Sequence, residues 1–302
     1  MQIPHLTAYL NGRFAPLDEL QISVLDRGFL FGDGVYEMIP VYSRCAFRLD
    51  EHLARLGRSL AEIGMDNPHD LATWRQIVLD LVARQDFCDP SSDLSVYIQV
   101  TRGVAYPRNH AFPAAGTIPT VFAFTDPLEV PPAGLFTQGV AAVTTRDLRW
   151  QRCDIKAISL LANVLAKQQA VEAGVAETIL LRDGGHGEEN LMIEGAASNI
   201  FIVKDGVIFA PAASELMLAG ITYELIIELA QAHDLPLKLG EVSEAMLRDA
   251  DEVWLTSSSK EILAIVVLDE RPVGNGKPGP IYQQMLSFYQ TYKATVMRRG
   301  EE

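Results

Sequence analysis

Apolar and polar positions alternate at the start of the chain, with the period of two that is typical of β-strands. The alternation over residues 6–10 stops at Asn11-Gly12 and resumes over residues 13–17. Asn-Gly between two extended runs is a strong hairpin signal, because both turn residues must take positive φ. A second hairpin is predicted with its strands at residues 35–42 and 45–49 and its turn at Ser43-Arg44.

A helical spacing of three to four residues follows the hairpins. It links Leu53, Leu56 and Leu60, so a helix is predicted from a cap at Asp50 to a stop at Gly64. The same reasoning predicts later helices over 71–84, 157–173 and 222–232 and one from Pro280. Strands are predicted over 94–101, 120–124, 140–144, 178–182, 200–203, 207–209, 252–256 and 262–267.

Residues 125–134, TDPLEVPPAG, interrupt this pattern with three prolines, which are unfavourable to regular structure. We take 126–134 as an interdomain linker between a small N-terminal α/β domain, 1–125, and a larger C-terminal domain, 135–302. Hairpins with helices dominate the first part, and strands mixed with helices dominate the second. The sequence therefore predicts an α+β, two-domain fold rather than one doubly wound sheet.

Composition excludes several classes of protein. Hydrophobic residues make up 48% of the chain and charged residues 21%, as in globular domains. The formal net charge of -14 opposes binding to nucleic acid. We find no apolar run of membrane-spanning length and no export signal, and we expect a cytoplasmic protein. A reducing compartment also suits the three scattered cysteines, Cys45, Cys88 and Cys153.

Two residues could carry chemistry on the evidence of their immediate surroundings. Lys156 is predicted where an extended segment meets a helix, beside apolar neighbours. Desolvation there would lower the pKa of its amine and favour a nucleophile, although a solvated lysine is the alternative. Glu194 lies between apolar and small residues, where a carboxylate needs a partner. A protonated ring nitrogen would serve, and an ordinary loop glutamate paired with an amide is the alternative.

Two further segments are suited to anions. Gly220-Ile221-Thr222 opens a predicted helix, where free N–H groups favour phosphate, and the hydroxyls of residues 256–259 follow a strand. Arg108 and His110 lie two residues apart in PRNHAFP, so on an extended segment they point the same way and could hold a carboxylate. A plain helix cap, a polar loop and a solvated surface loop are the respective alternatives.

Other motifs are set aside. The two glycines of FGDGVYE lack the preceding strand and following helix of a dinucleotide site. We see no histidine pair with metal-ligand spacing, so no metal site is predicted. We also see no GxSxG motif, so no sequence motif supports a serine hydrolase.

Several motifs occur along the chain, and their combination and order are more informative than any one of them. They are DRGFLFGDGVYE, EHLARL, YIQVTRG, PRNHAFP, RWQRCDIKAISLL, EGAASNIF, LAGIT and LTSSSKEI. Together they resemble the fold-type IV enzymes that use pyridoxal 5'-phosphate, the class IV aminotransferases, over about residues 26–268. PRNHAFP, RWQRCDIK and the tyrosine of DGVYE resemble bacterial D-amino-acid transaminases most.

The resemblance implies a role for each matching residue. Lys156 would hold the cofactor as a Schiff base and move a proton during catalysis. Glu194 would keep the pyridine nitrogen protonated. The remaining cofactor contacts would come from Arg55 and, within a cofactor-binding domain over 135–302, from Arg149 near the phenolic oxygen of the ring and from Leu218, Ile221, Thr222 and Ser258. The substrate carboxylate would be held by Tyr36, Arg108 and His110. The relatives place the last two in the neighbouring subunit, which implies a homodimer.

Four positions depart from the resembled pattern. Ala196 and Ala197 stand where relatives often have serines, Tyr223 stands where an arginine is common after GIT, and Lys260 adds a charge beside the proposed phosphate hydroxyls. We expect these changes to affect substrate preference or the start of the helix, and not the use of the cofactor.

The expected reaction is transfer of the amino group of a D-alanine-like amino acid to a 2-oxo acid. Within the same fold, a branched-chain L-amino-acid aminotransferase or an aminodeoxychorismate lyase is the alternative. From a different class, a non-catalytic protein that binds a small anion between two domains would need no reactive lysine.

Overall fold

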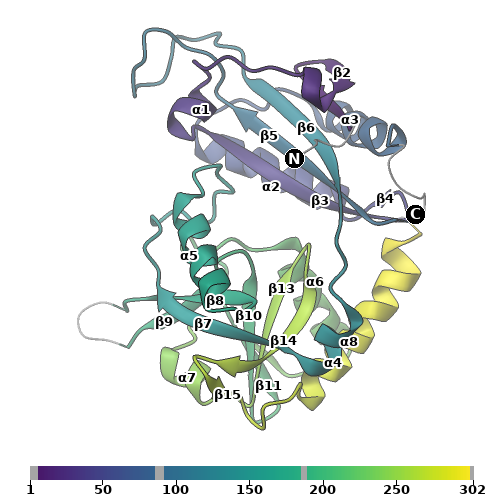
Figure 1. The fold of residues 1–302 in the computed structure, drawn as a ribbon, viewed down its shortest axis with the longest axis vertical. Helices are drawn as coiled ribbons and strands as arrows, with labels where there is room; N and C mark the ends of the chain where they lie inside the picture. The colour runs from purple at the N-terminus through teal and green to yellow at the C-terminus, as the bar shows by residue number, and fades with distance from the viewer. Residues whose placement is uncertain (1–5, 86–91, 185–188, 300–302) are drawn as a thin grey trace. The chain divides into compact units, whose positions relative to one another are not determined.

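The structure is a computed structural model that describes residues 6–85, 92–184 and 189–299. Cys88 lies outside the described residues. The contacts divide the chain into two compact units (Figure 1). The first unit comprises residues 1–129, 155–159 and 295–302, and the second comprises 130–154 and 160–294.

The first unit contains a six-stranded antiparallel sheet with the order β2-β1-β6-β5-β3-β4. Its strands are β1 (Thr7–Leu10), β2 (Arg13–Pro16), β3 (Gly34–Tyr42), β4 (Cys45–Ala46), β5 (Leu94–Thr101) and β6 (Thr120–Pro127). Both predicted hairpins are confirmed, but the strand predicted over 45–49 ends at Ala46, and Leu49 begins the next helix. Asn11 and Gly12 have φ of 48° and 92°, and Ser43 and Arg44 have φ of 51° and 68°.

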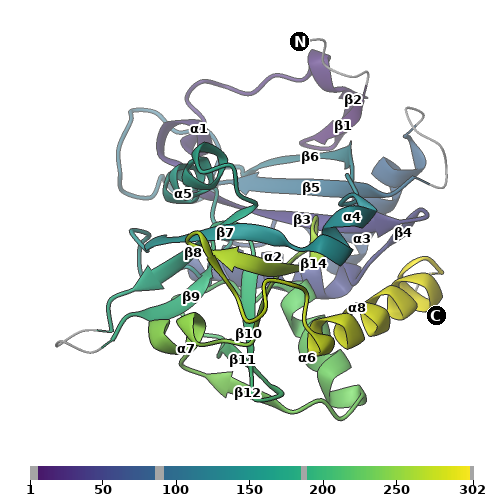
Figure 2. The same cartoon turned by 60° about the horizontal axis from the view of Figure 1, so that its bottom comes forward.

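Helices of the first unit cover one face of this sheet (Figure 2). They are α2 (Leu49–Glu62) and α3 (Leu71–Ala83), with the short α1 (Arg27–Phe31) and a 3₁₀ turn, η1 (Leu17–Glu19), elsewhere in the unit. The predicted cap at Asp50 is wrong, because the N-cap is Arg48, two residues earlier, in the left-handed conformation. Gly64 ends the helix as predicted, with φ of 63°.

Regular structure enters both ends of the segment 125–134, where none was predicted. β6 continues to Pro127, which stands at the last position of the strand, where a missing N–H is tolerated. At the other end α4 (Ala133–Gln138) begins directly after Pro132, whose φ of -52° suits a helix start. Proline marked the ends of elements here and did not exclude them. The linker and its domain boundaries stay a prediction.

The second unit is built on a nine-stranded mixed sheet with the order β12-β11-β10-β13-β14-β7-β8-β9, and β15 paired to β14. The strands are β7 (Val140–Arg146), β8 (Glu177–Arg182), β9 (Leu191–Gly195), β10 (Asn199–Lys204), β11 (Val207–Pro211), β12 (Leu237–Gly240), β13 (Glu252–Ser257), β14 (Glu261–Leu268) and β15 (Arg271–Pro272). β7 is parallel to both of its neighbours, and aliphatic side chains of the central strands form the core.

Helices α6 and α8 of the second unit pack side by side and contact β13 (Figure 2). The helices of this unit are α4, α5 (Leu161–Glu172), α6 (Ile221–Ala232), α7 (Glu244–Arg248) and α8 (Pro280–Tyr292). A π-helical turn, η2 (Lys293–Met297), follows α8, and its residues from 295 onward are assigned to the first unit. No helix within the described ranges is both long enough and apolar enough to cross a membrane.

The helix predicted over 157–173 begins too early. α5 starts at Leu161, because the preceding residues bond to β3 instead. Ala157 forms a β-bridge with Val35, and the Ile158 N–H donates to the Gly34 carbonyl at 3.1 Å. The short elements α1, α7, β9 and β12, of four or five residues each, were not predicted.

Candidate active site

Lys156 is positioned by strand β3 of the first unit. The Tyr36 N–H donates to the Lys156 carbonyl at 2.9 Å, and the Lys156 N–H donates to Ser59 Oγ at 3.3 Å. Its Nζ lies 4.4 Å from the centroid of the Tyr36 ring. The predicted position at the junction with a helix is wrong. Lys156 instead lies in a segment without regular structure that is hydrogen-bonded to β3, and this segment brings it beside Tyr36.

On the other face of β3, a buried ion pair contains Arg55. Glu37 is fully buried because alternate residues of a strand point to the same face, and Val35 and Ile39 share that face. Arg55 donates to both carboxylate oxygens, with Nε at 2.6 Å from Oε1 and a terminal nitrogen at 2.8 Å from Oε2. His52, one helical turn earlier, lies 2.9 Å from Oε2 through Nδ1.

The charge of this cluster follows from its contacts. Burial by itself raises the pKa of Glu37, but the charge of Arg55 and its hydrogen bonds, with help from His52, hold that pKa well below its ordinary value of 4.5. Burial lowers the pKa of His52, and Glu37 opposes this shift. Glu37 is thus an anion that fixes the guanidinium of Arg55 in one orientation.

Replacing Glu37 by glutamine is expected to lower the free energy of unfolding by about 3 kcal/mol, because a buried Arg55 would lose its counter-charge. Because the folded pKa of Glu37 is depressed, the stabilisation by its ion pair with Arg55 is fully present above pH 4.5. It decreases progressively as the pH falls below 4.5. Urea unfolding at pH 7 and pH 4 would measure both effects. Asp50→Asn, which removes an exposed pair with Arg75, is the control and should change little. Equal effects of the two substitutions would contradict the argument.

Arg108 and His110 lie together on an exposed loop of the first unit, where both contact one aromatic ring. The Arg108 guanidinium is 4.5 Å from the Phe31 ring centroid, and the His110 ring centroid is 5.1 Å from it. The structure therefore groups these two predicted substrate residues around Phe31, while Tyr36 contacts Lys156. Their joint action on a carboxylate stays a prediction.

Glu194 lies in β9 of the second unit, with its carboxylate buried among donors. Arg149 donates a hydrogen bond to Oε1. Asn199 donates to Oε2 at 3.3 Å, and the Leu218 N–H donates to the same oxygen at 3.2 Å. Burial raises the pKa of Glu194 to about 7, although the charge of Arg149 opposes the rise. Three of the predicted cofactor residues, Arg149, Glu194 and Leu218, are thus brought together.

Arg149 is itself held by a second carboxylate. Its Nε and a terminal nitrogen lie 3.0 Å from the two oxygens of Asp147, and Arg182 donates to Asp147 at 2.8 Å. Burial favours the neutral guanidinium, but Asp147 and Glu194 outweigh it and raise the pKa of Arg149. The predicted place of Arg149 near a phenolic oxygen is not tested. What the structure shows is an arginine that orients Glu194.

The start of α6 is suited to a phosphate. Ile221 and Thr222 are buried in its first turn, and no side chain among the described residues caps the helix at Gly220. A Cβ on Gly220 would lie 2.5 Å from Asn199 Oδ1, so only glycine leaves the amide of Asn199 undisturbed. Within the ranges that the structure describes, the buried hydroxyl of Thr256 has no hydrogen-bond partner. Free N–H groups and an unpaired hydroxyl fit an oxyanion. Ser258 follows in the turn after β13.

Two of the four residues that differ from the resembled pattern have defined hydrogen-bond partners. Lys260 donates to Glu177 Oε2 and to the Ala176 carbonyl, both at 3.1 Å, so a buried anion balances its charge. Tyr223 donates its hydroxyl to the Pro211 carbonyl at 2.7 Å. α6 begins at Ile221.

Sequence reasoning missed the residues that orient the predicted ones. Glu37, His52, Asp147 and Asn199 hold Arg55, Arg149 and Glu194. A signal existed for Glu37, because its place in the alternation of β3 puts a carboxylate on the apolar face. His52 and Asn199 contact Glu37 and Glu194 only because separate elements meet, whereas Asp147 lies two residues before Arg149 in the sequence.

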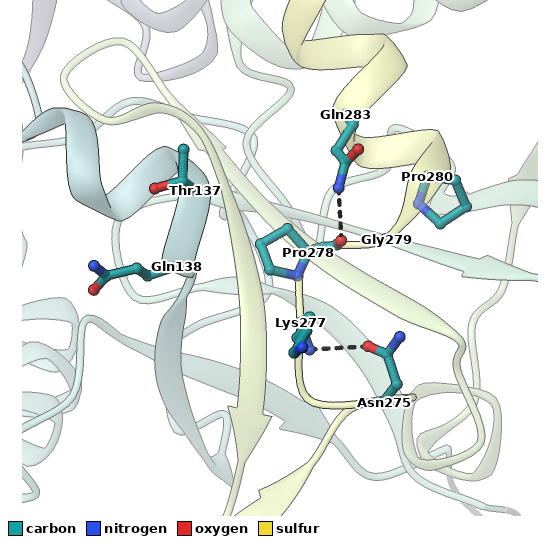
Figure 3. A pocket seen from close by; sticks show the side chains of 8 residues that line it. All are labelled: Thr137, Gln138, Asn275, Lys277, Pro278, Gly279, Pro280 and Gln283. Carbon is teal, nitrogen blue, oxygen red and sulfur yellow. Dashed lines mark hydrogen bonds between the residues drawn. The ribbon is translucent and has the colours of Figure 1, made fainter.

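A surface pocket of the second unit is lined by none of these residues (Figure 3). It is lined by Thr137, Gln138, Asn275, Lys277, Pro278, Gly279, Pro280 and Gln283. The N-terminus of α8 in its wall is already capped, since Glu252 accepts the N–H groups of Ile281 and Tyr282 at 2.9 and 2.7 Å. We therefore assign this pocket no role. Among the described residues, no group of three His, Cys, Asp or Glu side chains is arranged to hold a metal ion.

Comparison with known proteins identifies relatives over nearly the whole chain. The sequence model of the family described as amino-transferase class IV matches residues 34–268. A D-alanine aminotransferase of Bacillus licheniformis is 39% identical over 280 residues, which are 93% of this chain and 94% of that protein. A D-alanine aminotransferase of Staphylococcus aureus strain MW2 is 39% identical over 284 residues, 94% of this chain and 96% of that protein.

Among solved structures, this chain is similar to the branched-chain aminotransferase of the thermophilic archaeon Thermoproteus uzoniensis with norvaline. The TM-score is 0.81 at 27% identity, and the match covers 94% of this chain and 93% of that chain. The predicted α+β fold of two parts is therefore shared with a solved aminotransferase.

Proposed function

This chain belongs to the class IV aminotransferases, and we propose that it moves the amino group of a D-alanine-like amino acid to a 2-oxo acid with pyridoxal 5'-phosphate as cofactor. Family membership makes the chain an enzyme and sets aside the alternative of a non-catalytic binding protein.

The proposed preference for D-amino acids rests on the sequence identity between this chain and proteins named D-alanine aminotransferases. It reaches 39% over more than nine-tenths of the chain, against 27% for the branched-chain enzyme of similar structure. The branched-chain alternative keeps some support from that similarity of fold. An assay with D-alanine, L-leucine and aminodeoxychorismate as separate substrates, with 2-oxoglutarate as acceptor for the two amino acids, separates the three activities. Activity with L-leucine alone would reject the D-specific proposal.

The residues of the second unit fit a phosphorylated pyridine. Buried Glu194 would accept the N–H of the ring nitrogen, and Arg149 keeps this carboxylate oriented. Leu218 would pack on the ring. The first turn of α6, at Ile221 and Thr222, would bind the phosphate together with Ser258. The role of Arg55 as a further phosphate ligand is what the resemblance implies. When bound, the cofactor supplies an electron sink for negative charge at the substrate Cα.

Lys156 would hold the cofactor covalently through Nζ and move a proton between the substrate Cα and the C4′ position. The segment that carries it is anchored on β3 and Ser59, which restricts where the amine can reach. Tyr36, whose ring lies beside Nζ, would bind the substrate together with Arg108 and His110.

Two further expectations belong to this proposal. A homodimer would let Arg108 and His110 serve the neighbouring subunit, as the resemblance implies. A cytoplasmic location suits an enzyme whose described cysteines, Cys45 and Cys153, are both free thiols. Sedimentation analysis of the purified protein would test the first, and a monomer with full activity would contradict it.

Replacing Arg108 by leucine is expected to raise the KM for D-alanine on the order of 30-fold, because the substrate carboxylate would lose a charged, bidentate donor. Initial rates at varied D-alanine concentration measure the effect. Arg84→Leu is a control in the same unit, since Arg84 also lies over an aromatic ring, that of Phe14, at 4.5 Å. An unchanged KM in Arg108→Leu would remove Arg108 from the substrate site.

A further inference from the structure

We propose that Arg27 is a positioning residue for substrate binding, which it performs by clamping the backbone of residues 109–111. The inference rests on the proposed function, because it concerns the loop that carries Arg108 and His110. Arg27 itself lies in α1 and is 4% exposed.

The clamp consists of hydrogen bonds to three successive carbonyl groups. One terminal nitrogen of Arg27 donates to the Asn109 carbonyl at 2.6 Å and to the Ala111 carbonyl at 3.2 Å. The other terminal nitrogen donates to the His110 carbonyl at 3.2 Å. An exposed loop without regular structure is thereby fixed to a buried charge, residue by residue.

Asp33 sets the direction of this guanidinium. It accepts from Arg27 Nε at 2.7 Å, and it also accepts from Arg102 Nε at 2.9 Å. Burial raises the pKa of Asp33, but the two arginines outweigh it and lower that pKa, so the carboxylate stays ionised at neutral pH. Arg102 lies 3.8 Å from the Phe112 ring centroid, so this second arginine contacts the same loop.

The clamp acts on the residues that would meet the substrate. The Arg27 guanidinium lies 4.8 Å from the Phe31 ring centroid, and the same ring is contacted by Arg108 and His110. Arg27 therefore fixes the backbone on either side of His110 and the ring against which both side chains rest. A shift of about 1 Å in such a loop is enough to weaken substrate binding strongly.

Only arginine can make this set of bonds. Its planar group has five N–H donors in a fixed fork, whereas lysine has three donors around one nitrogen. Arg27→Lys keeps the positive charge beside Asp33 and loses the spread of donors across three carbonyls. It separates the role of the fork from that of the charge.

Steady-state kinetics of the holoenzyme with D-alanine and 2-oxoglutarate tests the proposal. We expect Arg27→Lys to raise the KM for D-alanine about ten-fold and to change kcat less than about two-fold, since the groups that act on the bound substrate are intact. Arg44→Lys is the matched control. Arg44 also clamps two carbonyls of the first unit, those of Val82 and Gln85, and should leave the KM unchanged.

A double variant shows whether Arg27 acts through Arg108. If it does, Arg27→Lys and Arg108→Leu together should raise the KM by less than the product of their separate effects. If the KM of the double variant rises by the full product of the two separate effects, or if Arg27→Lys has the wild-type KM, the inference is overturned and the proposed function stays in place. An unchanged KM in Arg108→Leu would instead remove the proposed substrate site and this inference with it. If Arg27→Lys does not fold, Asp33→Asn must show the same KM effect, or the inference fails.

Discussion

Replacing Lys156 by alanine is expected to lower the rate of amino transfer on the order of 10⁴-fold, because the variant lacks both the covalent attachment and the base that moves the proton. The rate would be followed with D-alanine and 2-oxoglutarate. Borohydride reduces the C=N bond of a Schiff base to an amine, so the wild-type protein should lose its yellow colour and keep the cofactor covalently attached, whereas gel filtration should remove the cofactor from the variant.

Lys204→Ala is a suitable control for this experiment. Lys204 belongs to the second unit, where it forms ion pairs with Asp249 and Asp251 at the surface. The control should retain the wild-type rate and should keep the cofactor covalently attached after borohydride treatment. A Lys156→Ala variant with more than a tenth of the wild-type rate would show that another amine carries the reaction, and the central assignment would be wrong.

Glu194→Gln is expected to reduce kcat on the order of 10²-fold. Glutamine keeps the shape of the side chain but cannot provide the negative charge that holds a ring nitrogen protonated. Rates at saturating D-alanine, and the absorption spectrum of the bound cofactor, would measure the loss. The control is Glu252→Gln, since Glu252 is also a buried carboxylate of the second unit but caps α8. Equal losses of kcat in the two variants would indicate general damage to the unit.

The same substitution has a consequence for the protein without cofactor. Burial raises the folded pKa of Glu194 from 4.5 to about 7, so its contribution to stability is fully present below pH 4.5 and is lost as the pH rises through 7. The stability of wild type relative to Glu194→Gln should therefore fall between pH 4.5 and pH 8, by roughly 3 kcal/mol at most. Urea unfolding across this range measures the difference. A rise with pH would contradict the raised pKa.

Several features of the molecule were accessible from local sequence. The hairpin at Asn11-Gly12 and the end of α2 near Gly64 depend on residues that accept positive φ, a property of the residue itself. The order of the motifs from residue 26 to residue 268 was enough to identify the family. These signals lie within a few residues of one another or in a fixed sequence, so no contact between distant elements was needed.

Other features arose from contacts between distant parts of the chain. Helical spacing placed Lys156 at a helix start, but pairing with β3 took up the backbone of the residues after it and delayed α5 to Leu161. Hydrogen bonds across many residues also decided the partners of the candidate groups. Arg55 faces Glu37 because α2 packs on β3, and Glu194 faces Arg149 across 45 residues of chain.

The sequence by itself determined the family, the cofactor chemistry that the family implies, and the residues most suited to carry it. The tertiary structure alone decided how those residues are held. Arg27 illustrates the difference, since nothing near it in the chain indicates that its guanidinium reaches residues 109–111. Local preferences act over a few residues, whereas charge, burial and hydrogen bonding depend on which distant groups folding brings together.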